Sequence, residues 1–157
     1  MAGKMLSPAN AREACLNSLV NFEKDKKYSN IELGEAIERY ELNDLDRSFF
    51  TKLFYGVIEK KLTLDYYIKN ICNKNQKIDI KILNILRMGL YQILYMDKVP
   101  DNAACNESVE LAKKSNPNNI KIGGFVNAVL RSFIRNKEEH LKSIDKIGDF
   151  YKNLEMI

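Results

Sequence analysis

The segment from residue 80 to residue 96 constrains the fold of this chain more than any other. Twelve of its seventeen residues are apolar, and they are distributed all round a helical wheel rather than along one stripe. A helix that is apolar on every side is buried on every side. We therefore expect a helix over about residues 79–97 at the centre of a bundle. Gly89 costs about 1 kcal/mol relative to Ala inside a helix, so we expect another helix to approach closely there.

Apolar residues elsewhere recur at helical spacing, and the strict alternation of half-buried strands is hard to find. Ser7 with Pro8, and Asn43 with Asp44, have the residue types of helix starts. The spacing predicts further helices, with one that begins after Asn43 and a separate short helix that Thr63 starts. The sequence thus predicts an all-α bundle of about seven helices, followed by a partly helical tail over residues 138–157.

The composition excludes several classes of protein. A chain of 157 residues has the length of one domain, and its 45% hydrophobic and 29% charged residues exclude a disordered or fibrous protein. No window holds 18 uninterrupted apolar residues and no signal-peptide run opens the chain, so we expect a cytoplasmic protein without a membrane partner. Cys15, Cys72 and Cys105 lie far apart and His140 is the only histidine, so we expect reduced thiols and no metal.

The sequence also lacks the motifs of common catalytic sites. The sequence has no glycine-rich nucleotide loop, and Gly123-Gly124 is its only close glycine pair. His140 lies in a charged tail with no serine or cysteine nucleophile near it in sequence. We therefore expect no catalytic residue in this chain.

The distribution of charge is more informative than the net charge of +4. Residues 111–137 hold six cations and no Asp or Glu. In the helix predicted over residues 120–136, Arg131 and Arg135 lie opposite the apolar stripe. Gly124 lies on the same side and adds no side chain between the cations. Arginine grips phosphate oxygens through two donors at once. The residues leave two interpretations open, a face that binds a polyanion and a solvated helix face that contacts another domain.

An ordered series of motifs resembles the NusB-like helical domain. It comprises residues 85–95, Val99-Pro100, residues 106–113 and residues 124–131, preceded by Ala11-Arg12 with Ala14, by Asp46-Arg47 and by Tyr55-Gly56. The resemblance implies a NusB-like RNA-binding domain over residues 1–137. It also implies that residues 138–157 form a tail or linker toward a catalytic domain absent from this chain.

Two kinds of protein carry this domain, the standalone antitermination factor NusB and ribosomal RNA methyltransferases of the RsmB (Sun/Fmu) type. The run Arg87-Met88-Gly89, the pair Ala103-Ala104 and the ending Leu130-Arg131 are more similar to the methyltransferases, as is the overhanging tail. The resemblance therefore implies a domain that positions ribosomal RNA for cytosine-5 methylation by its own C-terminal methyltransferase domain. The alternatives are a standalone antitermination factor, which binds RNA together with a ribosomal protein, and a helical module for protein contacts.

The catalytic parts of the methyltransferase family are missing from this sequence. None of the three cysteines follows Pro or Thr, as the family's nucleophile does, and no glycine-rich cofactor loop exists. S-adenosylmethionine is thus implied for the absent catalytic domain and no cofactor for this chain.

The residues expected to contact RNA come from two sources. Arg12 matches a basic position of the antitermination relatives, and the remaining five come from the cationic segment. The predicted RNA-binding residues are Arg12, Lys113, Lys114, Lys121, Arg131 and Arg135. We interpret Arg47 and Arg87 as internal ion-pair partners or helix-end ligands. Asn106 and Asn127 are expected to make hydrogen bonds between helices, because a buried amide without partners costs about 1–3 kcal/mol.

Overall fold

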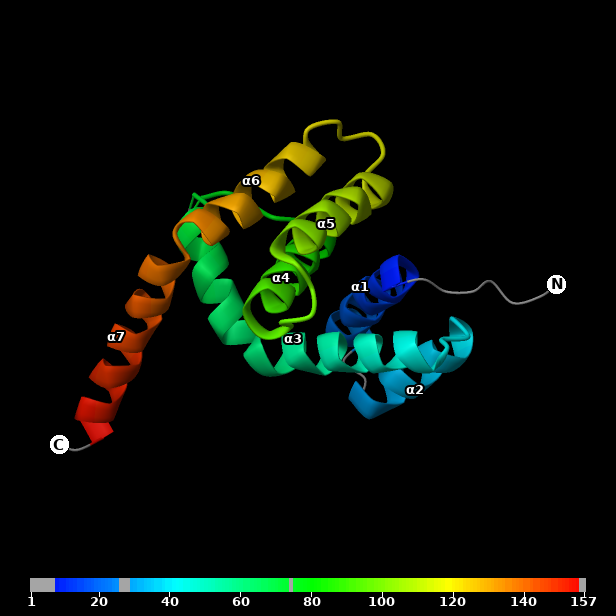
Figure 1. Cartoon of the computed structure of the whole chain (residues 1–157), viewed down its shortest axis with the longest axis horizontal. Coiled ribbons are helices and arrows are strands. Elements are labelled where there is room, and N and C mark those ends of the chain that lie inside the picture. The colour runs from blue at the N-terminus through cyan, green and yellow to red at the C-terminus, as the bar shows by residue number, and fades with distance from the viewer. Residues whose placement is uncertain (1–7, 26–28, 74, 156–157) are drawn as a thin grey trace.

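The computed structural model describes the backbone of residues 8–25, 29–73 and 75–155, and the side chains of residues 11–25, 30–73 and 75–148. Over these residues the chain forms seven helices and no strand (Figure 1). They are α1 (Pro8–Asp25), α2 (Ser29–Arg39), α3 (Asp44–Ile71), α4 (Ile80–Tyr95), α5 (Asp101–Ser115), α6 (Ile122–Arg135) and α7 (Lys137–Glu155). The predicted all-α bundle is confirmed. The described part of α1 starts at Pro8, and Ser7, expected as its N-cap, lies outside the described residues.

Helix α4 is the core of the bundle, as its sequence predicts. It contacts α1, α3, α5 and α6, and eleven of its sixteen residues are buried. The Asp79 side chain caps its first turn by accepting a hydrogen bond from the Lys81 backbone N–H. A Cβ added at Gly89 would lie 2.9 Å from Leu130 Cδ1 and 3.0 Å from Ser108 Oγ. The expected close approach at Gly89 is therefore confirmed, and it brings both α5 and α6 against α4.

The prediction that Thr63 starts a separate helix is wrong. Helix α3 runs without interruption from Asp44 to Ile71, although it changes direction along its length (Figure 1). Its second half extends to α6, where the Tyr67 and Phe133 rings lie 5.1 Å apart. The apparent break in the sequence is a solvent-facing stretch, in which Lys61 and Leu62 are exposed. The expected start at Asn43 is confirmed, because its side chain accepts from the Asp46 N–H at 2.8 Å.

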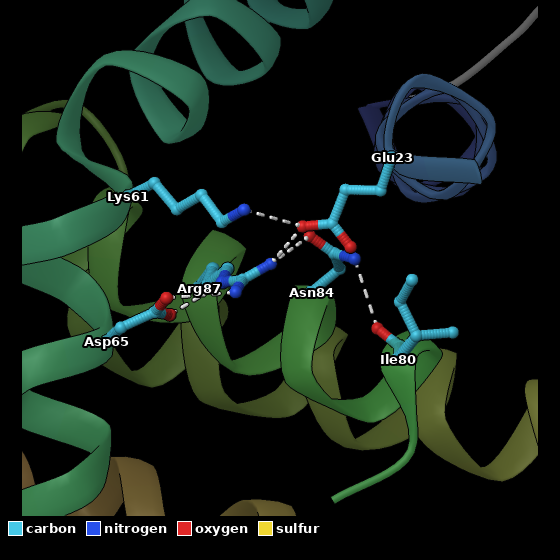
Figure 2. A network of polar contacts seen from close by, with 6 residues as sticks. All are labelled: Glu23, Lys61, Asp65, Ile80, Asn84 and Arg87. Atoms are coloured by element: carbon cyan, nitrogen blue, oxygen red, sulfur yellow. Dashed lines mark hydrogen bonds and ion pairs between the residues drawn. The ribbon is translucent and has the colours of Figure 1, made fainter. Parts of the chain in front are cut away.

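An ion-pair network joins α1, α3 and α4 inside the bundle (Figure 2). Arg87 of α4 is 4% exposed, and its Nε and Nη2 donate to the two carboxylate oxygens of Asp65 at 2.7 and 2.9 Å. Its Nη1 donates to Glu23 at 2.6 Å and to Asn84 Oδ1 at 3.2 Å. Lys61 Nζ lies 3.3 Å from the same Glu23 oxygen. The internal ion-pair role expected for Arg87 is confirmed, whereas Arg47 is exposed on α3 and not internal.

Helix α7 extends from the end of α6 away from the rest of the bundle (Figure 1). At its base the His140 ring stacks on Phe133, with ring centroids 5.2 Å apart, and the Tyr66 hydroxyl bonds to Ser143. Further along, Leu141 and Ile147 are 37% and 38% exposed. The segment expected to be a partly helical tail thus begins as an ordered helix, and its role as a linker stays a prediction.

Candidate nucleic-acid interface

The outer face of α6 presents two arginines on a surface of small residues. Burial of Val126, Val129, Leu130 and Phe133 fixes the inner face of the helix and turns Arg131 and Arg135 outward. Gly124 and Ala128 are exposed beside them, and a Cβ added at Gly124 would meet no other atom within 4 Å. The first turn of α6 carries no acidic residue. A polymer backbone can therefore approach this face closely without meeting a carboxylate on the helix itself.

Arg131 is held in place by three asparagines. Its Nη2 donates to Asn102 Oδ1 at 2.9 Å and to Asn106 Oδ1 at 3.4 Å, both on α5. Its Nε donates to Asn127 Oδ1 at 3.3 Å, one turn earlier on α6. The hydrogen bond expected between helices is confirmed for Asn106, whereas the bond of Asn127 lies within α6. Sequence patterns do not single out Asn102, because its partner is 29 residues away and only the pairing of α5 with α6 brings the two together.

A second group of cations lies at the other end of α5. Arg12, Lys113 and Lys114 line one hollow of about 400 Å³ between α1 and α5. The same hollow is lined by the carboxylates of Glu13, Glu107 and Glu110. Lys114 Nζ lies 2.7 Å from Glu13, and Lys113 Nζ lies 3.5 Å from Glu110. These lysines therefore have carboxylates beside them, unlike the arginines of α6.

Arg12 lies mostly inside the protein. It is 7% exposed, and its Nε donates to Gln92 Oε1 at 2.8 Å. Its guanidinium stands over the Phe49 ring, 4.8 Å from the centroid. Burial lowers the pKa of Arg12, and the charge of Glu107 opposes this shift. The geometry gives Arg12 a role in joining α1, α3 and α4, and the RNA contact expected for it stays a prediction.

Lys121 marks the start of α6 and is exposed. It lines a hollow with Asn116 and Asn119 of the loop between α5 and α6. The Lys113 side chain reaches the same end, since its Cε would lie 3.0 Å from a Cβ added at Gly123. From Lys121 to Arg135 the axis of α6 rises by about 20 Å. Five of the six predicted cations thus lie along α5 and α6, which run side by side (Figure 1). Arg131 lies at the Asn102 end of α5, opposite Lys113 and Lys114, whereas Arg12 lies on α1.

The described residues do not bring together a set of metal ligands. They contain no group of three or more His, Cys, Asp or Glu side chains that could hold a metal ion. Burial raises the pKa of the Cys15, Cys72 and Cys105 thiols, which keeps them protonated and poorly nucleophilic near neutral pH. Among the described helices, none is both long and apolar enough to cross a bilayer.

These features define a helical domain with a cationic face and a core built around one apolar helix. The model of the NusB family matches residues 9–135. The chain belongs to the NusB family.

Relatives of two kinds match the chain. The probable ribosomal RNA small subunit methyltransferase B of Bacillus subtilis is 38% identical over 149 residues, which cover 95% of this chain and 32% of that protein. The corresponding protein of Synechocystis is 32% identical, over 87% of this chain and 30% of the relative. The chain thus spans about a third of the length of these relatives. The transcription antitermination protein NusB of Ruminiclostridium cellulolyticum is 36% identical, over 76% of this chain and 83% of the relative.

Solved structures share the fold at low sequence identity. NusB of T. maritima superimposes with a TM-score of 0.76 at 19% identity, over 87% of this chain and 98% of that one. A chain from the complex of antitermination factors NusB and NusE with double-stranded RNA gives a TM-score of 0.72 at 20% identity, over 81% of this chain and 95% of that one.

Proposed function

We propose that this chain is the RNA-binding N-terminal domain of a cytoplasmic small-subunit ribosomal RNA (cytosine-5) methyltransferase. Its role is to hold ribosomal RNA for a catalytic domain carried elsewhere on the same polypeptide. The cationic residues on α5 and α6 supply the attraction to the phosphate backbone, which dominates the affinity of proteins for nucleic acids.

The observation that favours the methyltransferase is how far each match extends along this chain. The Bacillus methyltransferase match covers 95% of the chain, whereas the family model ends at residue 135 and the NusB match of Ruminiclostridium covers 76%. A match of 95% has to include much of α7, which begins at Lys137. The sequence similarity to the methyltransferase therefore continues into the segment of α7, past the end of the family match.

The methyl donor belongs to the catalytic domain in this proposal. S-adenosylmethionine would supply the methyl group there, and the described residues of this chain do not fit it. Over the described part of the chain there are only helices, so no strand leads into a glycine-rich loop. The contribution of this chain is to bind and orient RNA, and no chemical step passes through its residues.

The gene that encodes the chain provides the direct test. We expect the reading frame to continue past Ile157 into a segment with a cysteine after Pro or Thr and a glycine-rich loop. A stop codon directly after Ile157 would contradict the methyltransferase assignment. The matching biochemical test is binding of the chain to small-subunit ribosomal RNA.

A standalone antitermination factor is the second candidate. The observation in its favour is that the chain covers 83% to 90% of the length of several NusB relatives. This candidate predicts specific binding to a short antiterminator RNA together with a ribosomal protein. A purified ribosomal protein partner that leaves the RNA affinity unchanged would argue against it.

A further inference from the structure

The cluster of Asn102, Asn106, Asn127 and Arg131, here called the Asn–Arg cluster, has a property that charge alone does not reveal. All three asparagine Oδ1 atoms accept hydrogen bonds from Arg131. The three amide nitrogens have no partner among the described residues, and an amide nitrogen only donates. The arginine thus engages every amide oxygen of the cluster, each of which keeps one lone pair, and leaves the amide N–H groups free.

The free donors of the cluster have no partner in the described part of the chain. Arg131 uses Nε and Nη2, so the two N–H groups of Nη1 are available, together with the Nδ2 groups of the three asparagines. Asn102 and Asn106 are exposed, whereas Asn127 and Arg131 are half-buried. The cluster therefore presents to solvent one charged donor group and three neutral ones.

No carboxylate of the described residues forms an ion pair with Arg131. Among these residues, none of the ion pairs found within 4.0 Å includes Arg131, and the sequence of α6 contains no Asp or Glu. The hollow at the other end of α5 differs, because Lys113 and Lys114 both have glutamates within 4.0 Å. A ligand that enters the Asn–Arg cluster does not have to displace an internal anion.

The position of Arg131 is fixed before any ligand arrives. Two of its three hydrogen bonds join α6 to α5 and the third lies within α6, so little side-chain entropy remains to be lost on binding. Exposed Gly124 and Ala128 lie on the same face of α6 and leave room for a polymer backbone, and Arg135 lies one turn further on.

We propose that the Asn–Arg cluster binds the non-bridging phosphate oxygens of an RNA backbone. Free N–H donors around a guanidinium favour an anionic acceptor, and phosphodiester oxygens are anionic acceptors that arginine grips well. This inference rests on the proposed RNA-binding function and assigns it to the arginine end of the α5–α6 pair.

The test compares variants of the 157-residue chain for binding to two labelled RNAs, an unstructured single strand and a duplex of equal length. Arg131→Lys keeps the charge and loses the planar fork with its three bonds. We expect its affinity to fall about 10-fold, because the lost hydrogen bonds involve a charged group, with the salt dependence unchanged. Arg39→Lys on α2 makes the same chemical change away from the cluster and should bind as the unmodified chain does.

A second variant keeps the proposal testable if Arg131→Lys unfolds. Asn106→Asp preserves the shape of the side chain and places a carboxylate beside Arg131. We expect an affinity loss of about 10-fold or more, with a shallower dependence on salt, because one cation is then neutralised. Thermal melting checks that the variants remain folded.

The outcomes distinguish a failure of the Asn–Arg cluster as an RNA site from a failure of the proposed RNA-binding function. If the unmodified chain binds RNA and both variants bind equally well, the Asn–Arg cluster joins α5 to α6 and does not bind RNA, while the proposed function stands. If the unmodified chain binds neither the single strand nor the duplex at low salt, both proposals fail. If the unmodified chain prefers one of the two RNAs and both variants lose this preference, the cluster binds the backbone of the preferred form, single-stranded or duplex.

Discussion

Arg87 carries more of the stability of the fold than its single charge suggests. It is 4% exposed and holds Asp65 and Glu23 together across α1, α3 and α4. Replacing one member of a buried ion pair leaves the other charges without compensation, which typically costs about 3–5 kcal/mol. Both carboxylates keep 21% side-chain exposure, so we expect Arg87→Met to lower the free energy of unfolding by about 3 kcal/mol.

Lys61 provides the matched control, because it pairs with the same Glu23 oxygen from the surface. Its side chain is 46% exposed, and exposed pairs contribute about 0–1 kcal/mol. Denaturant unfolding of Arg87→Met and Lys61→Met should therefore give clearly different decreases in stability. Equal decreases would show that the network is worth no more than a surface pair.

The same network predicts a dependence of stability on pH. Burial raises the pKa of Glu23, but the hydrogen bonds and charges of Arg87 and Lys61 outweigh it, and the net shift is downward. A carboxylate with a lowered pKa in the folded state stabilises the fold above its unfolded pKa of about 4.3 and loses this contribution as the pH falls. Unfolding measured between about pH 6 and pH 3 should show a smaller acid-induced loss for Glu23→Gln than for the unmodified chain. An unchanged pH profile would show that Glu23 does not contribute to the pH dependence of stability.

Gly56 is a second residue on which packing depends. A Cβ added there would lie 2.0 Å from Tyr91 Cζ, so Gly56→Ala forces the largely buried Tyr91 ring to move. Overpacking of this kind costs about 1–3 kcal/mol. Gly34→Ala in α2 is the control, because a Cβ at Gly34 meets nothing within 4 Å and alanine favours a helix by about 0.5–1 kcal/mol. Melting temperatures that change in the same direction for both variants would contradict this interpretation.

At the scale of elements, the continuity of α3 is the feature that the sequence misses. Both halves contact α4, at Tyr91 and at Arg87, and the second half also reaches α6. The exposed stretch around Lys61 and Leu62 separates their apolar patterns. Proline inside a helix removes a hydrogen bond and clashes with the preceding turn, at a cost of about 3 kcal/mol or more. We expect Thr63→Pro to lower stability by that amount and Thr63→Ala to change it little, as measured by denaturant unfolding followed by circular dichroism. A proline variant as stable as the alanine variant would mean that α3 is interrupted there.

Other elements can be predicted because their signals are local. Helix α4 is apolar on all sides, so it has to lie at the centre of the bundle. Asn43 and Asp79 are cap residues directly before the helices that they start. Helix α7 is only partly predictable, because its described contacts with the bundle are few and none of its described side chains is fully buried. The Asn–Arg cluster cannot be assembled from sequence, since Asn102 and Arg131 meet only after α5 packs on α6.

At the scale of the whole molecule, the distribution of cations defines how the domain meets a polyanion. The mixed hollow of Lys113, Lys114 and three glutamates lies at one end of α5, and the carboxylate-free arginines of α6 lie at the other. The family, the fold and this separation of the arginines from the mixed hollow together support a domain that holds RNA while another domain acts on it.

The dependence of RNA affinity on salt tests this claim most directly. If the cations of α5 and α6 neutralise about three to five phosphates of a single strand, log K against log salt should have a slope of about −2 to −3.5. Replacing Arg131 and Arg135 together by alanine should make the slope shallower by about 1.4, at about 0.7 for each phosphate that is no longer neutralised. A flat salt response, or a slope that the double variant leaves unchanged, would contradict the account.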